Sequence, residues 1–417
     1  MGALGGFLFG YPLVMAFVWM LLALGFLLRR EWPDRGRSSP PPGIPFPVSI
    51  LIPCYNEAAN LADTIRYALE SAWPQFELIA INDGSSDDTG RLLEQWAARD
   101  PRVRVVHLAK NQGKAMALQA GALLARHELM VCIDGDALLD AQAVAWLVRR
   151  FQADPGLGAV TGNPRIRNRT SLLGRIQVGE FSSIIGLIKR AQSMLGGLFT
   201  VSGVITAFRR SALHEVGYWS VDMLTEDIAI TWALQRAGWR VAYEPQALVW
   251  ILMPETLRGL WKQRLRWAEG GIQVLLANAN LLVQPRQWRL LPLLVEPWLS
   301  LVWAQAIALM LLAWLGQHLG LLGGGNPLAM PLLPSSSGLW LGATCLLQFG
   351  FSLWLDRPYD RRLGRNFYWM IWYPIAFWVL TMATSVVALP MVLRRRRGLR
   401  ARWVSPDRGF GIGSAKP

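Results

Sequence analysis

Two acidic residues follow an apolar segment that is predicted to be a strand. Asp134 and Asp136 flank Gly135 directly after Leu129–Ile133. In an extended chain residues i and i+2 point to the same side, so both carboxylates can face one divalent cation of the kind that bridges to a diphosphate. A tight turn is the alternative, but two acids beside a buried strand are costly without a cation. The pattern therefore favours a metal site.

A second acidic pair lies at the start of a predicted helix. Glu226 and Asp227 follow Thr225 and precede the amphipathic segment Ile228–Ala237. Acids are common at helix N-termini, where they cap the helix and interact favourably with its dipole. The functional alternative is a general base that removes a proton from an acceptor hydroxyl. The sequence leaves both explanations open for Asp227.

Polar residues also follow the first two predicted strands. Pro53, Tyr55 and Glu57 come after the first strand, and Asp83 comes after the second. A carboxylate at this position can accept hydrogen bonds from a nucleotide base or ribose. Alternatively, Asp83 and its polar neighbours form a turn and cap the next helix. Taken alone, the pattern favours this structural explanation.

An arginine and tryptophan motif occupies one face of a predicted helix. Gln263 lies three and four residues before Arg266 and Trp267, within the segment Leu257–Leu276. Arginine can bind a diphosphate through two hydrogen bonds, and the indole ring offers an apolar face to a sugar. A belt of aromatic and basic residues at lipid headgroups explains the same residues equally well.

These motifs require a scaffold, which an alternation of strand and helix patterns supplies. Alternating elements imply an α/β fold whose parallel-rich sheet carries helices on both faces, with ligands at the carboxyl ends of the strands. The predicted strands are Val48–Ile52, Leu78–Ile81, Val103–Val106, Leu129–Ile133 and Gly158–Val160. The predicted helices between them are Leu61–Leu69, Arg91–Ala98 and Lys114–Ala125.

The composition shows that part of the chain lies in lipid. Hydrophobic residues make up 53% of the sequence, which contains 21 Trp. Ala3–Leu28 carries no charge, is long enough to cross a hydrocarbon core of about 30 Å, and is followed by Arg29 and Arg30, which indicates a cytosolic C-terminal end. The segment Leu257–Leu276 is typical of an interfacial helix. The expected organisation is an anchor (1–30), a linker (31–47), a cytosolic α/β domain (48–250), interfacial helices (251–289), a membrane region (290–393) and a basic tail (394–417).

The membrane region contains three candidate spans, at residues 290–315, 339–355 and 367–393. If all three cross the bilayer, the arginine cluster that begins at Arg394 lies outside, against the positive-inside bias. Pro374 and Pro390 single out the last run as a candidate re-entrant or interfacial segment.

The net charge of +14 would suit a nucleic acid. The arginines, however, cluster beside apolar runs, and the sequence has no zinc-ligand spacing and no aromatic ribonucleoprotein motif. Anionic lipid headgroups are the better partner, and nucleic acid is not an expected one. The three cysteines are far apart in the sequence, as expected of small buried residues in a reducing compartment.

The order of these motifs resembles that of the processive family 2 glycosyltransferases, which make cellulose, chitin and hyaluronan. Asp83 comes first, followed by the Asp134 and Asp136 pair, the Thr225 to Asp227 triplet and the Gln263 to Trp267 motif, and membrane spans follow. Longer stretches, at residues 131–140, 158–190, 199–220, 250–271 and 401–409, are similar to bacterial poly-N-acetylglucosamine synthases. The resemblance covers about residues 47–409, with one departure, since enterobacterial members carry two N-terminal spans where this chain has one.

The resemblance implies a GT-A type nucleotide-sugar-binding domain and roles for residues at matching positions. Asp83 would hold the uridine of UDP-N-acetylglucosamine, and Lys114 would lie near the nucleotide. Asp134 and Asp136 would bind the diphosphate, Asp136 through Mg²⁺ or Mn²⁺, and Asp227 would be the catalytic base. The remaining substrate-binding positions would be Pro53, Tyr55, Glu57, Glu226, Gln263, Arg266 and Trp267, the last three closing over the diphosphate and the acceptor end.

The resemblance also implies a biological setting. The product would be poly-β-1,6-N-acetylglucosamine, a biofilm exopolysaccharide, made by inverting transfer to the growing chain and exported across the bacterial inner membrane by a multi-pass protein. A small membrane partner of the PgaD type and the activator cyclic di-GMP would assist, although the sequence contains no cyclic di-GMP motif. The alternatives are another processive synthase of the same fold, or an inactive polysaccharide-binding or export protein; intact acids at positions 83, 134, 136 and 227 argue against the inactive protein.

Overall fold

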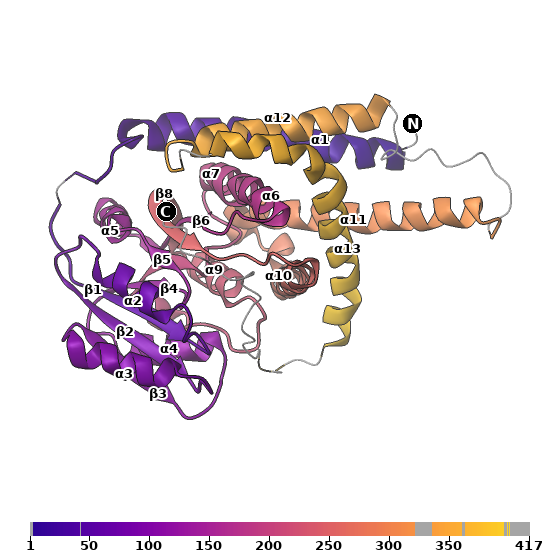
Figure 1. The fold of residues 1–417 in the computed structure, drawn as a ribbon. Coiled ribbons are helices and arrows are strands. Elements are labelled where there is room, and N and C mark those ends of the chain that lie inside the picture. Colours follow the sequence, from indigo (N-terminus) through magenta and orange to yellow (C-terminus); the bar gives the residue numbers. More distant parts are fainter. Residues whose placement is uncertain are drawn as a thin grey trace.

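The computed structural model describes residues 3–41, 43–321, 336–360 and 363–395, together with residues 398 and 400. An eight-stranded sheet forms the centre of the α/β domain (Figure 1). Its strands are β1 (Val48–Cys54), β2 (Phe76–Asp83), β3 (Val103–Leu108), β4 (Leu129–Ile133), β5 (Leu138–Leu139), β6 (Leu157–Ile166), β7 (Ile205–Arg209) and β8 (Arg240–Ile251). Their spatial order is β3-β2-β1-β4-β7-β6-β8-β5.

The sheet is mixed and mostly parallel. Strands β1 to β4 pair in parallel, as the strand and helix alternation predicted, and all five predicted strands are confirmed. The strands β5, β7 and β8 were not predicted, and they introduce antiparallel pairs of β7 with β4 and β6 and of β5 with β8. β5 has only two residues, which is too short for a strand pattern to appear in the sequence.

Helices cover both faces of the sheet. One face carries α2 (Leu61–Leu69), α3 (Thr89–Arg99), α5 (Ala143–Ala153) and α6 (Leu172–Phe181). The other carries α4 (Lys114–Leu124), α8 (Arg210–Glu215) and α9 (Glu226–Arg236). α2 illustrates why these segments pack, because Leu61, Ile65 and Ala68 recur at helical spacing and are fully buried against the sheet.

The carboxyl ends of β1, β2 and β4 meet at one edge of the sheet. In the β1–β2 pair, Cys54 lies opposite Asn82, so the loops that follow both strands start side by side. Gly84 has a positive φ of 65°, and a Cβ there would lie 2.5 Å from the backbone carbon of Lys110. Glycine therefore lets the loop before α4 approach the end of β2, and Lys114 at the start of α4 reaches this edge.

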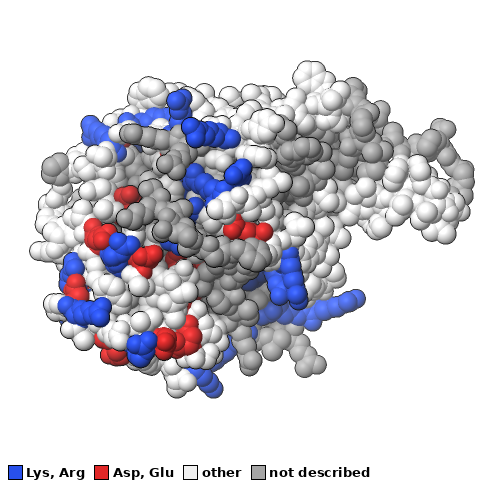
Figure 2. Space-filling model, in the orientation of Figure 1, with Lys and Arg blue, Asp and Glu red and all other residues white. Residues whose placement is uncertain are grey.

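Among the described residues, three helical runs are long and apolar enough to cross a membrane: Ala3–Asp34, Pro285–His318 and Gly338–Asp356. They correspond to α1 (Ala3–Phe26), α11 (Leu291–His318) and α12 (Ser336–Asp356), which run along a common direction beside the α/β domain (Figure 1). Charged side chains gather over the α/β domain, whereas the described part of α11 that projects from it shows none on the face in Figure 2. Leu309 and Leu312 are exposed there, as expected of a surface that faces lipid.

The last apolar run differs from the other three. It begins with a 3-10 helix (Leu363–Trp372) and continues as α13 (Tyr373–Arg394), which runs across the direction of α11 and packs against it and against α10 (Leu257–Ala277) (Figure 1). α13 as a whole has 22 residues, contains Pro390 and carries no charged residue before Arg394, so its length and composition are compatible with a span. The basic tail beyond residue 400, including residues 401–409, lies outside the described residues.

The segment predicted to be a linker begins with a buried acid. Glu31 ends a π-helical turn that continues α1, and it accepts a hydrogen bond from Arg190 Nε at 2.6 Å. Arg190 belongs to α7 (Ile188–Met194) and also binds Asp356, the last residue of α12, at 2.8 Å. Arg165 on β6 binds the other oxygen of Asp356 at 2.6 Å. This ionic network, which consists of Glu31, Arg165, Arg190 and Asp356, is buried and joins α1 and α12 to the α/β domain.

Candidate active site

Lys114 is the centre of an acidic cluster at the carboxyl edge of the sheet. Its Nζ atom lies 2.5 Å from Asp134 Oδ1 and 3.2 Å from Glu226 Oε1, and it donates a hydrogen bond to the Gly203 carbonyl at 3.0 Å. The start of α4, the end of β4, the start of α9 and the segment before β7 therefore converge on one ammonium group.

Asp227 belongs to the same cluster. Its Oδ2 accepts a hydrogen bond from the Gly203 N–H at 3.3 Å, and its Oδ1 accepts one from the Ile228 N–H at 2.9 Å. One carboxylate oxygen therefore contacts the first turn of its own helix and the other contacts Gly203, so Asp227 belongs both to the helix start and to the cluster. Burial, reinforced by the charge of Glu226, raises the pKa of Asp227 to about 6.

The neighbouring groups have different proton affinities. Burial disfavours the ionised form of Glu226, but Lys114 and Arg266 outweigh it and lower the pKa of Glu226. Burial also opposes the charge of Lys114, whereas Asp134 and Glu226 together raise its pKa. Asp134 has a raised pKa because burial outweighs the attraction of Lys114. The cluster thus combines a charged pair with a carboxylate, Asp227, that titrates close to neutral pH, a combination suited to base catalysis.

Asp83 is fully buried and holds the loop that leads into α4. Its two carboxylate oxygens accept hydrogen bonds from the backbone N–H groups of Gln112 and Gly113, at 2.8 and 2.9 Å. Burial raises the pKa of Asp83, and these two hydrogen bonds oppose the rise. The turn role that the sequence also allowed belongs to Asp87, which accepts a hydrogen bond from the Thr89 N–H at 3.0 Å. Asp83 therefore connects the second strand to Lys114.

The turn that carries Asp134 and Asp136 packs against the segment after β1. A Cβ on Gly135 would lie 3.0 Å from both the Pro53 carbonyl oxygen and Glu57 Cγ, so glycine allows this close approach. The segment from Pro53 through Tyr55 to Glu57 thereby borders the acidic turn. The carboxylates of Asp134 and Asp136 supply the oxygen ligands that hard divalent cations prefer. In the described part of the chain no three His, Cys, Asp or Glu side chains form a ligand set.

The motif helix α10 packs against α9, which carries Glu226 and Asp227. A Cβ on Gly270 would collide with the side chain of Thr225, so this glycine lets α10 pack against the residue that precedes α9. The positive charge of Arg266 acts on Glu226 and Asp227 across this contact. The structure therefore places the Gln263 to Trp267 motif next to the acids that precede it by some 40 residues in the sequence.

Arg264, inside the motif, was not among the predicted site residues. Its guanidinium donates hydrogen bonds to Glu180 at 2.5 Å and to Gln263 Oε1 at 3.1 Å, and it lies 4.3 Å from the centre of the Trp267 ring. Arg264 and Glu180 are both buried, so this pair holds the motif against α6. The i, i+3 spacing of Arg264 and Trp267 was a usable signal, whereas nothing in the sequence pointed to Glu180 or Gly203.

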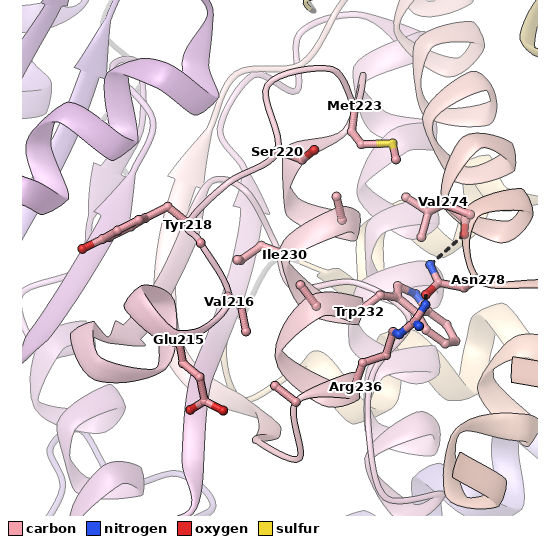
Figure 3. Close-up of a pocket in the computed structure, with 15 residues that line it drawn as sticks. Glu215, Val216, Tyr218, Ser220, Met223, Ile230, Trp232, Arg236, Val274 and Asn278 are labelled. Atoms are coloured by element: carbon pink, nitrogen blue, oxygen red, sulfur yellow. Dashed lines mark hydrogen bonds between the residues drawn. The ribbon is translucent and has the colours of Figure 1, made fainter. Parts of the chain in front are cut away.

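A cavity of about 530 Å³ lies on the other side of α9 (Figure 3). Tyr218 and Met223 from the preceding loop line it, as do Trp232 and Arg236 from α9, and Arg236 donates a hydrogen bond to Asn278 at 2.9 Å. None of the predicted site residues lines the cavity. The cavity is therefore separate from the acidic cluster.

A mixed, mostly parallel α/β sheet with paired acids at its carboxyl edge defines the class of GT-A type glycosyltransferases. Comparison with a solved structure agrees with this class. The mannosyltransferase PcManGT from Pyrobaculum calidifontis, in complex with GDP-Man and Mn²⁺, superposes with a TM-score of 0.56, covering 94% of this chain and 97% of that one. At 20% identity the similarity establishes the fold alone.

The chain belongs to glycosyltransferase family 2, because the family described as glycosyltransferase like family 2 matches residues 45–270. It is 38% identical over 415 residues to the poly-beta-1,6-N-acetyl-D-glucosamine synthase of Staphylococcus epidermidis, covering 97% of this chain and 98% of that protein. The synthase of the same name from Staphylococcus aureus strain COL is 38% identical over 407 residues, with the same coverage. The resemblance noted in the sequence is thus confirmed, and the protein is a glycosyltransferase.

Proposed function

We propose that this protein polymerises N-acetylglucosamine from UDP-N-acetylglucosamine into poly-β-1,6-N-acetylglucosamine. The observation that carries the proposal is the similarity to the two staphylococcal synthases, which covers 97% of the chain and so includes the membrane helices as well as the catalytic domain. Cellulose, chitin and hyaluronan synthases share the short motifs, so the long match is what favours N-acetylglucosamine joined through its 6-hydroxyl.

The donor would bind at the carboxyl edge of the sheet. Asp83 would contact the uridine and hold the loop at Gln112 and Gly113 against it. Asp134 and Asp136 would bind the diphosphate together with Mg²⁺ or Mn²⁺. When bound, this ion would neutralise the diphosphate charge and so make UDP a better leaving group. Pro53, Tyr55 and Glu57, which border the same turn, would complete the nucleotide site.

Transfer would proceed as a single inverting displacement. Asp227 would remove the proton from the 6-hydroxyl of the acceptor as that oxygen attacks the anomeric carbon, and the bond to UDP would break in the same step. Glu226 and Lys114 would hold the base in place through their ion pair and the Gly203 contacts. Arg266 would stabilise the charge on the departing diphosphate, and Trp267, fixed by Arg264, would pack against the acceptor sugar with Gln263 beside it.

The membrane helices would place this reaction on the cytosolic face of the bacterial inner membrane. If α1, α11 and α12 each cross once and Arg29 lies inside, the end of α12 returns to the cytosolic side. The ion pairs of Asp356 with Arg165 and Arg190, two residues of the catalytic domain, support this orientation. α10 and α13 would lie at the interface, and the spans would form the export path of the polymer, with a partner of the PgaD type and cyclic di-GMP as an activator.

Purified membranes containing the full chain should convert UDP-N-acetylglucosamine into polymer that a β-1,6-specific hexosaminidase degrades. Chelation by EDTA should stop synthesis, and added Mg²⁺ or Mn²⁺ should restore it. The Asp136→Asn variant should stay inactive with either metal ion, whereas Asp88→Asn, which changes an exposed acid outside the site, serves as the matched control. Polymer that resists the hexosaminidase but is degraded by chitinase would assign the chain to the chitin synthases. Synthesis that continues in EDTA would contradict the metal site.

Asp83→Asn should weaken UDP binding by about tenfold. An amide nitrogen cannot accept a hydrogen bond, so either the Gln112 or the Gly113 N–H loses its partner and the loop before α4 loosens; one such buried bond corresponds to about 1–1.5 kcal/mol. Titration of UDP into the detergent-solubilised protein would measure the affinity, with Asp87→Asn as the neighbouring control. Unchanged affinity in Asp83→Asn would exclude Asp83 from the nucleotide site.

A further inference from the structure

Lys189 is a buried lysine that the mechanism above does not use. It lies on α7, its side chain is 4% exposed, and its Nζ donates a hydrogen bond to Ser202 Oγ at 2.8 Å. In the portion of the chain that the structure describes, no carboxylate lies within ion-pair distance of this nitrogen. A buried ammonium group without a paired carboxylate is unfavourable, so its presence requires a specific reason.

The hydrogen-bond partner of Lys189 belongs to the segment that contacts the proposed base. Ser202 precedes Gly203, whose N–H donates to Asp227 Oδ2 and whose carbonyl accepts from Lys114 Nζ. A Cβ on Gly203 would lie 3.2 Å from Lys114 Nζ and 3.3 Å from Asp227 Oδ2, so the backbone fits tightly between the two side chains. A displacement of the Ser202–Gly203 segment therefore moves a hydrogen-bond partner of both Lys114 and Asp227.

The side chains of Thr161 and Thr206 hold the backbone of Ser202 in place. Its N–H donates to Thr161 Oγ1 and its carbonyl accepts from Thr206 Oγ1, both at 2.7 Å. The hydroxyl group is thus the part of Ser202 that remains for Lys189. Burial lowers the pKa of Lys189 to about 7, and the Asp227 carboxylate opposes this change, which indicates that the two groups interact across the segment.

We propose that Lys189 is a positioning residue for Asp227: through Ser202 it holds the Gly203 backbone against the base. The proposal rests on the role of Asp227 proposed above. The geometry assigns Lys189 to the acceptor side of the reaction, because Ser202 and the Gly203 N–H connect it directly to Asp227, whereas the Asp134–Asp136 turn is reached only through a further residue, Lys114. Its loss should impair the proton-transfer step more than donor binding.

The test compares Lys189→Met, Ser202→Ala and the double variant in membranes supplied with UDP-N-acetylglucosamine. Lys189→Met should lower kcat by about 10- to 100-fold, as expected for a misaligned catalytic group, while the KM for the donor changes less than about twofold. Ser202→Ala should lower kcat in the same direction, and the double variant should be no worse than Lys189→Met, because both changes break the same contact. Lys262→Met, an exposed lysine on α10, serves as the control.

The outcomes separate this proposal from the function on which it rests. Three results would each overturn the positioning role. The first is an unchanged kcat in Lys189→Met, the second is an equal loss of donor affinity and kcat, and the third is additive effects of the two single changes. If Lys189→Met does not fold, Ser202→Ala alone decides: a loss of kcat at constant donor KM supports the proposal, and wild-type kinetics overturn it. Full turnover by Asp227→Asn would instead refute Asp227 as the base, whatever Lys189 does.

Discussion

Asp227→Asn should lower polymer synthesis by about three orders of magnitude while UDP binding is retained, since a general base contributes typically 10²- to 10⁴-fold. The amide has nearly the same shape as the carboxylate, so it can keep the contact with Gly203, but it cannot accept the acceptor's proton. Asp227 lies on the Gly203 side of the cluster, away from the loop that Asp83 holds, and the donor site should therefore be preserved. Incorporation of labelled sugar and titration of UDP would measure the two effects separately.

The raised pKa of Asp227 also leads to an expected pH dependence of the reaction. Only the ionised carboxylate can accept a proton, and burial raises the pKa of Asp227 to about 6. The rate should therefore be level at higher pH and fall as the pH drops through about 6. Asp88→Asn, at an exposed acid, should leave both the rate and its pH profile unchanged. Retained turnover in Asp227→Asn, or a profile of the active enzyme that is flat down to pH of about 4, would exclude Asp227 as the base.

Arg190→Met should destabilise the protein by about 3–5 kcal/mol, the usual effect of removing one member of a buried ion pair. Arg190 is completely buried and binds both Glu31 and Asp356, so its loss leaves two carboxylates in the interior with less compensation. These acids end two membrane helices, and the substitution should therefore loosen the docking of α1 and α12 on the catalytic domain. The unfolding midpoint of the detergent-solubilised protein would record the loss.

An exposed ion pair provides the comparison for this second prediction. Arg91 and Asp88 form an i, i+3 pair on the surface of α3, and Arg91→Met should change stability by less than about 1 kcal/mol. Adding Glu31→Gln to Arg190→Met should recover part of the loss, because one uncompensated charge disappears. A midpoint for Arg190→Met that equals that of Arg91→Met would show that the ionic network does not hold the membrane helices in place.

Local sequence patterns predicted those strands and helices whose hydrophobic residues recur with a regular spacing or form a continuous apolar run. The first four strands, α2 and α10 begin and end close to the expected residues, because their hydrophobic periodicity and flanking polar residues are properties of adjacent positions. Strands β7 and β8 were missed because their partners lie far away in the chain. The buried position of Glu31 was missed for the same reason, since its partner Arg190 comes 159 residues later.

Residue types and their order along the chain were enough to predict membrane segments beside an α/β domain, and to select Asp83, Asp134, Asp136 and Asp227 as acids of the candidate site. Which of these groups meet could be seen only in the folded chain. Lys114 joins Asp134 to Glu226, Gly203 lies between Lys114 and Asp227, and Lys189 reaches Asp227 through Ser202. These contacts depend on how β4, α4, α7 and α9 pack at one edge of the sheet, and that packing results from the burial of apolar side chains that are distant in sequence.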